Sequence, residues 1–119
     1  MLNEFYENSV GIYLIPGATD MRKGYDKLMQ LVASKTDQNF FHGGLFVFAG
    51  RNLKTIKILY WDTNGFCIWQ KRLDKEKFWW PKDTSEVCKI TSKQLRWLLD
   101  GLNPMELKGH KELKYSIVC

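Results

Sequence analysis

Basic and aromatic side chains are the groups in this sequence with the clearest chemical potential. Arg22 and Lys23 stand side by side at the entrance of a predicted helix, where backbone N–H groups also favour a phosphate. Further cations occupy a predicted turn and a stretch in which lysines alternate with aromatic residues. Cations contact phosphates, and exposed aromatic rings stack on unpaired bases. The residues predicted to bind nucleic acid are Arg22, Lys23, Arg51, Lys54, Lys71, Arg72, Lys77, Trp79 and Trp80.

Most of these groups also have a purely structural interpretation. Five tryptophans in 119 residues would build a good core, so burial is the alternative for each of them. Lys75 and Lys77 could lie in a solvated turn and pair with neighbouring carboxylates. By contrast, no folding role is apparent for Arg51, Lys71 or Arg72, which makes them the cations to test.

The charge of the chain is distributed unevenly. The net charge is +5, but residues 1–50 carry −1 and residues 51–119 carry +6. A one-sided basic surplus favours a polyanionic partner, with nucleic acid first. The alternative is that lysines simply keep a small domain soluble.

Carboxylates, histidines and cysteines form no pattern that predicts catalysis. Asp20 is expected to cap a turn, Asp26 to face out from a helix, and Asp62 to open a turn. The two histidines have no metal-ligand spacing, and the three cysteines are expected to be free thiols. We therefore predict no enzyme, no metal and no cofactor. The enzymatic alternative requires a polar pocket that holds Asp20 or Asp62 with a strongly shifted pKa.

The stretch from Gly43 to Leu73 is expected to organise the fold. Three apolar runs are separated there by turn residues, and Asn64-Gly65 is a strong signal for a tight reversal. Three such runs within a short stretch predict an antiparallel meander. The runs are Leu45–Ala49, Ile56–Trp61 and Phe66–Trp69.

The remaining segments predict two helices and two short strands. Apolar spacing predicts a helix from about Tyr25 to Ser34, and the capping box at Thr91 opens another over 92–100, with Gly101 ending it. Val10–Ile15 is a strand candidate that Pro16-Gly17 should stop. Glu86–Ile90 is the second strand candidate, and Trp79-Trp80-Pro81 is expected either to pair as an edge strand or to fold over the sheet as a lid.

The sequence therefore predicts a single α+β domain over residues 1–119, a small antiparallel β-meander sheet packed with two amphipathic helices. The basic tail, residues 103–119, is expected either to dock as a last strand or to stay mobile. No apolar run is long enough to span a membrane, and the N-terminus does not resemble a signal peptide. We expect a cytoplasmic protein that does not bind membranes.

Four motifs in this order resemble one known family. They are TDMRKG at 19–24, LFVF at 45–48, WDTNGFC-x-W-x-KRL at 61–73 and FxWP at 78–81. The chain from about 11 to 102 is similar to the accessory protein of the IS-66 insertion-sequence family, the small product of its second open reading frame, often called TnpB. That family is unrelated to the RNA-guided nuclease with the same label. Tyr60 stands where tryptophan is common in the family, and the tail after Leu102 does not align.

The resemblance implies a bacterial protein that is encoded by a mobile element and assists transposition. A separate, larger transposase carries the catalytic residues, and the resemblance assigns none to this chain. The leading hypothesis is a non-catalytic accessory protein that binds DNA, expected at the transposon ends, through a basic face. The alternative is an adaptor that docks on the transposase of the same element through an exposed aromatic patch. The oligomeric state is left open.

Overall fold

A mixed five-stranded sheet forms the centre of the computed structural model, which describes residues 11–37, 44–83 and 86–104. Its strands lie in the order β4-β3-β2-β1-β5. No helix in this described part is long and apolar enough to cross a membrane. The elements are β1 (Ile12–Ala18), α2 (Tyr25–Lys35), β2 (Leu45–Ala49), β3 (Thr55–Asp62), β4 (Gly65–Arg72), β5 (Cys88–Ile90) and α3 (Ser92–Leu99).

The predicted meander is confirmed as β2, β3 and β4, which pair antiparallel in an unbroken register. The reversal between β3 and β4 differs by one residue from the expected one. Asp62 pairs with Gly65, so Gly65 is already the first residue of β4 and the turn consists of Thr63 and Asn64. The positive φ of 54° falls on Thr63.

Strand β1 adds a parallel pair that the sequence analysis did not anticipate. It runs parallel to β2, with Ile12 opposite Leu45, and antiparallel to β5, with Ile12 opposite Ile90. Parallel neighbours need a long crossover connection, which is usually a helix. The helix α2 lies in that connection, and its observed bounds confirm the prediction from apolar spacing.

The expectation that Pro16-Gly17 stops the first strand is wrong. The strand continues to Ala18, with an irregular register between Leu14 and Ala18. Pro16 has no N–H to donate to the ladder, and Gly17 adopts a φ of +80°, so the strand bends there instead of ending.

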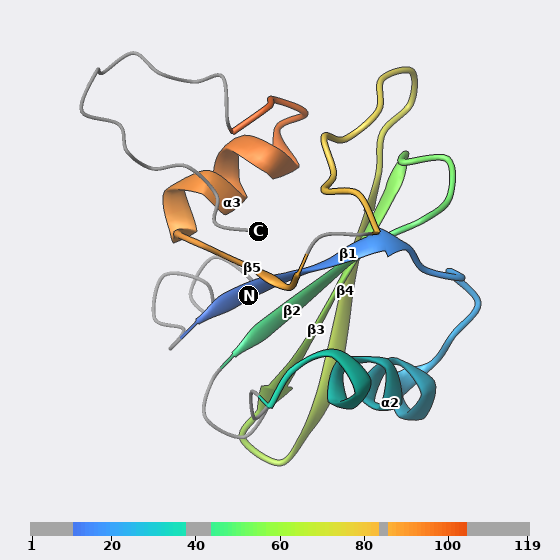
Figure 1. Cartoon of the computed structure of the whole chain (residues 1–119), viewed down its shortest axis with the longest axis vertical. Helices are drawn as coiled ribbons and strands as arrows, with labels where there is room; N and C mark the ends of the chain where they lie inside the picture. Colours follow the sequence, from blue (N-terminus) through green and yellow to red (C-terminus); the bar gives the residue numbers. More distant parts are fainter. Residues whose placement is uncertain (1–10, 38–43, 84–85, 105–119) are drawn as a thin grey trace.

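The two faces of the sheet carry separate hydrophobic clusters. On one face, Leu28 and Val32 of α2 pack over strand residues such as Phe46 and Leu59. On the other face, α3 and the segment 73–81 pack over residues such as Ile58. Figure 1 shows α2 and α3 on opposite sides of the sheet. A helix therefore packs on each face of the sheet.

Helix α3 has the predicted signals at both of its ends. The side chain of Thr91 accepts from the backbone of Gln94, and the side chain of Gln94 returns a bond to the backbone of Thr91. Gly101 has a φ of 84°, and bonds from Gly101 N to Leu98 O and from Leu102 N to Trp97 O end the helix.

Between β4 and β5, the chain folds over the sheet as a lid. This was one of the two predicted alternatives for Trp79-Trp80-Pro81; the other was an edge strand. The backbone N–H of Phe78 donates to Leu53 O (2.7 Å), and the ring of Phe78 is 2% exposed. The free thiol is confirmed for Cys67 but is wrong for Cys88, which is disulfide-bonded. Pairing depends on which Cβ atoms the fold brings within about 4 Å, and spacing along the chain does not reveal this. Residues 105–119 of the tail lie outside the described part.

Candidate nucleic-acid interface

A cavity of about 630 Å³ lies at one end of the sheet. Its walls come from the end of β1 and the turn after it, from the turn between β2 and β3, and from the end of β4. The carboxyl ends of the parallel strands β1 and β2 meet there, which is where open α/β sheets usually bind ligands. We call it the arginine cavity. It is lined by Ala18, Thr19, Asp20, Met21, Arg22, Gly50, Arg51, Asn52, Thr55 and Arg72.

Backbone contacts hold the walls of the arginine cavity together. The N–H of Thr19 donates to Ala49 O (2.8 Å) and so joins the end of β1 to the end of β2. A Cβ on Gly50 would lie 2.8 Å from Cγ of Met21, so only glycine lets the two turns approach this closely without displacing that side chain. At the far wall, Arg72 is placed by its pairing with the first residue of β3.

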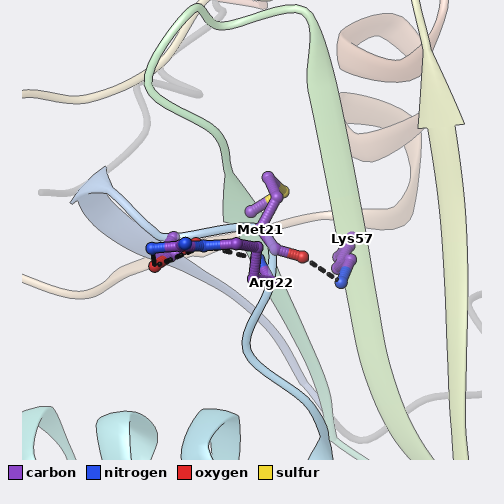
Figure 2. Close-up of polar contacts among 4 residues, drawn as sticks. Met21, Arg22 and Lys57 are labelled. Atoms are coloured by element: carbon purple, nitrogen blue, oxygen red, sulfur yellow. Dashed lines mark hydrogen bonds and ion pairs between the residues drawn. The ribbon is translucent and has the colours of Figure 1, made fainter.

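The turn that carries Arg22 is held by hydrogen bonds within the turn and by others from Lys57 of β3. Asp20 accepts from the backbone N–H of Arg22 (2.9 Å), which is the predicted capping role, and its carbonyl accepts from Lys23 N (3.1 Å). From β3, the ammonium group of Lys57 donates to Met21 O (2.5 Å) and to Lys23 O (3.5 Å). Figure 2 shows Lys57 directed at the carbonyl of Met21, with the side chain of Arg22 on the other side. The bracing role of Lys57 was not predicted, although a lysine in an apolar strand is a signal for one.

Asp20 and Arg22 form an ion pair at the mouth of the cavity. Nη2 of Arg22 lies 2.7 Å from Oδ2 of Asp20, and its Nε also donates to this carboxylate. Hydrogen bonds from Arg22 hold the pKa of Asp20 well below its ordinary value, and the same pair raises the pKa of Arg22. Because the pKa of Asp20 is lowered in the folded state, the pair persists above the ordinary aspartate pKa and is lost only as pH falls through the lowered value.

Arg51 and Arg72 are both exposed, and their guanidinium groups have no hydrogen-bond or ion-pair partner within residues 11–37, 44–83 and 86–104. Arg51 comes from the turn between β2 and β3, and Arg72 from the last position of β4. With Arg22 and Asp20, they give the walls of the cavity an excess of two positive charges. The structure therefore brings together three of the seven predicted cations.

Three other predicted cations lie outside the walls of the cavity. Lys23 is half-buried beside the braced turn. Lys54 is half-buried, and its backbone accepts from Leu73 N (2.8 Å). Lys77 is exposed on the segment that folds over the sheet. Asn52 and Thr55 line the cavity but were not predicted, because a single uncharged polar residue carries no signal of binding.

Lys71 has a folding role, contrary to the expectation from sequence. Its ammonium group donates to Leu99 O at 2.7 Å. Leu99 is the last residue of α3, where backbone carbonyls lack partners within the helix and the helix dipole favours a positive charge. The alternation of side chains along a strand directs Lys71 to the α3 face and Arg72 to the other face.

The two predicted stacking residues pack in or against the core. Trp80 is 9% exposed, and its indole N–H donates to Ile15 O (3.0 Å) and Gly17 O (3.1 Å). Trp79 is half-buried and packs against the same cluster. Burial, which was the structural alternative to stacking, is therefore observed for Trp80. Trp79 is partly buried, and only part of its side chain faces solvent.

The other candidate groups for acid–base chemistry lie away from the cavity. Asp26 is exposed on α2, and Asp62 accepts from the hydroxyl of Thr63 (3.1 Å) at the opposite end of β3. Burial, with added contributions from Cys67 and Asp62, raises the pKa of Tyr60. Within the described part, no group of three or more histidines, cysteines or carboxylates is placed to hold a metal ion.

The chain matches a family model over residues 10–109, that of the IS66 Orf2-like proteins. It is 36% identical over 95 residues to the uncharacterized protein y4hO of Sinorhizobium fredii, a match that covers 80% of this chain and 83% of that protein. It is also 27% identical over 89 residues to the uncharacterized protein y4jC of the same organism, covering 75% and 76%. No solved structure matches the chain.

Proposed function

The chain belongs to the IS66 Orf2-like family, and from that premise we propose that it is a non-catalytic accessory protein of transposition that binds DNA through the arginine cavity. The family connects the protein with an insertion sequence, as the motifs in the sequence implied. The proposed partner is the DNA of that element, with its ends as the first candidate.

One observation carries this proposal: Arg22, Arg51 and Arg72 come from three separate elements and line the same cavity. Guanidinium groups present a planar fork of donors that suits phosphate oxygens, and they stay charged at every physiological pH. Two of the three have no protein partner in the described part of the chain, so their donors are available to a ligand.

The carboxylate in the cavity supports a non-catalytic role. A general acid or base works best with a pKa near the operating pH. The lowered pKa of Asp20 keeps it ionised and bonded to Arg22, which is the state of a residue that orients its neighbour. We therefore assign Asp20 the task of holding Arg22 in place.

The adaptor alternative has less support. It relied on an exposed aromatic patch, but Phe78 and Trp80 are buried and Trp79 is half-buried. In the described part of the chain, the large hydrophobic side chains with high exposure are Tyr25 (47%), the first residue of α2, and Leu102 (43%), which follows α3. Neither observation favours a docking surface for the transposase.

The test measures DNA binding of the full chain and of the double variant Arg51→Gln/Arg72→Gln by fluorescence anisotropy. Duplexes from the element's ends and from unrelated sequence are titrated between about 50 and 200 mM salt. The slope of log K against log salt is negative, and each lost phosphate contact should reduce its magnitude by about 0.9. The magnitude should therefore be about 1.8 smaller for the double variant than for the wild type. Lys27→Gln/Lys89→Gln removes two exposed cations, on α2 and β5, that do not line the cavity; it is the control of matched charge and should lose less.

Absence of binding by the wild-type protein at low salt would contradict the proposal. Equal slopes for Arg51→Gln/Arg72→Gln and the control Lys27→Gln/Lys89→Gln would also contradict it. A pull-down with the transposase of the same element tests the adaptor alternative. Capture that survives high salt and persists in the double variant would favour the adaptor.

A further inference from the structure

Three of the predicted cations, Arg22, Arg51 and Arg72, line one cavity, and the other four predicted cations do not line it. A protein that follows a duplex backbone contacts successive phosphates with a row of cations. Here the neighbouring cation Lys71 is bonded to Leu99 O, and Lys54 and Lys77 lie outside the cavity walls. The arrangement suits a single, highly charged group better than a run of phosphates.

The free donors can be counted. Arg22 uses Nε and Nη2 on Asp20, which leaves its Nη1 for a ligand. Arg51 and Arg72 have their whole guanidinium groups available within the described part of the chain. Three guanidinium groups thus have donors available at the walls of one cavity, and these walls have an excess of two positive charges.

These numbers distinguish two kinds of phosphate. A phosphodiester inside a strand has one negative charge and two terminal oxygens, and chain continues on both of its sides. A phosphomonoester has close to two negative charges near neutral pH and three terminal oxygens. It also has substituents on one side only, so it can enter a concave site.

We infer that the arginine cavity binds a phosphomonoester at the end of a DNA strand, held by Arg22, Arg51 and Arg72. This inference rests on the proposed function and names the part of DNA that is bound. The cavity volume of about 630 Å³ is within the usual range for sites that take a small ligand. Asp20 acts as a positioning residue for Arg22.

The experiment compares oligonucleotides of one sequence that differ only at the end: a 5′-phosphate, a 3′-phosphate or hydroxyls. Binding to the full chain is measured by anisotropy at fixed low salt, with the label at the opposite end. One phosphorylated end should bind about tenfold more tightly than its hydroxyl counterpart, since a hydrogen-bonded charged group contributes about 1.4 kcal/mol or more. The preference should disappear in Arg51→Gln/Arg72→Gln and persist in the control Lys27→Gln/Lys89→Gln. Circular dichroism verifies that each variant is folded.

A pH series supplies a second readout. The second ionisation of a phosphomonoester occurs near about pH 6, so the preference for the phosphorylated end should grow from pH 5 to 7. Within the described part of the chain, the charged residues that line the cavity are Asp20, Arg22, Arg51 and Arg72. Asp20 stays ionised over this range because its pKa is lowered, and guanidinium groups do not lose their charge in proteins.

The outcomes separate the inference from the proposed function. Equal affinity for phosphorylated and hydroxyl ends, with binding still weakened in the double variant, would overturn the inference and leave DNA binding intact. Absence of any DNA binding would overturn both. A preference that survives in the double variant would show that the monoester site lies elsewhere. Full competition by a nucleoside monophosphate at the same concentration as the phosphorylated oligonucleotide would assign the cavity to free nucleotides and overturn the DNA-end version.

Discussion

At the scale of single residues, the adjacent cations Lys71 and Arg72 have different tasks. They are equivalent by charge, but successive side chains of a strand point to opposite faces. Lys71 lies opposite Ile56, whose side chain belongs to the cluster under α3, and it binds the last carbonyl of that helix. Arg72 lies opposite Thr55, and both residues line the arginine cavity.

We predict that Lys71→Met and Arg72→Gln separate stability from binding. Lys71→Met leaves Leu99 O without its charged donor and should lower the free energy of unfolding by about 1 kcal/mol. Arg72→Gln should leave this energy within about 0.5 kcal/mol of the wild-type value, because its side chain is exposed. Urea denaturation measures both. In the DNA-binding assay, Arg72→Gln should lose more affinity than Lys71→Met. A larger loss of affinity for Lys71→Met would contradict these assignments.

At the scale of elements, the bend in β1 and the segment after β4 support one another. Gly17 N donates to Pro81 O (3.2 Å), and Trp80 returns a bond from its indole N–H to Gly17 O. These bonds hold the segment 73–81 against the bend in β1. Beyond the bend, the end of β1 forms part of the wall of the arginine cavity. A local departure from regular strand geometry thus positions two elements.

Gly17→Ala should be strongly destabilising. A Cβ at Gly17 would lie 2.6 Å from Cβ of Asp83, and its φ of +80° is unfavourable for any residue with a side chain. We expect a loss of about 1 to 3 kcal/mol in the free energy of unfolding. Gly65→Ala is the matched control, because a Cβ there would meet nothing within 4 Å. Similar urea midpoints for the two variants would show that the bend is not under steric constraint.

At the scale of the whole molecule, the strand order gives the sheet one protected centre and two unequal edges. Strand β2 lies between β1 and β3, and all five of its residues are buried. Strand β4 is eight residues long and forms one edge, and the three-residue β5 forms the other. Alternate amide groups of β4 point away from β3 because only one side of an edge strand is paired within the sheet.

Hydrogen exchange followed by NMR should report this order directly. The amides of Phe46, Val47 and Phe48 should exchange only through global unfolding, whereas the outward amides of β4 should exchange faster through local opening. Equal protection of the outward amides of β4 would contradict an open edge and indicate that another chain segment or a second copy pairs with it. Repeating the measurement at several protein concentrations distinguishes these two possibilities.

Local signals in the sequence predicted most of the secondary structure. The apolar spacing of α2, the capping box at Thr91 and the glycine after α3 depend on residues that are near in the chain, so they can be read from the sequence. The meander was predicted for the same reason. The path of β1 through Pro16-Gly17 was not, because a turn signal does not reveal whether neighbouring strands can accommodate a bend.

The sequence by itself determined the elements, the surplus of positive charge and the motifs that indicate the family. Only the tertiary structure decided which cations act together. Arg22, Arg51 and Arg72 are far apart in the chain. The parallel pairing of β1 with β2 and the antiparallel pairing of β2, β3 and β4 bring them to one end of the sheet. The same packing assigned Lys71 to a helix end and Trp80 to the core. Charge and aromaticity are properties of single residues, whereas convergence and burial depend on long-range strand pairing, which local patterns do not encode.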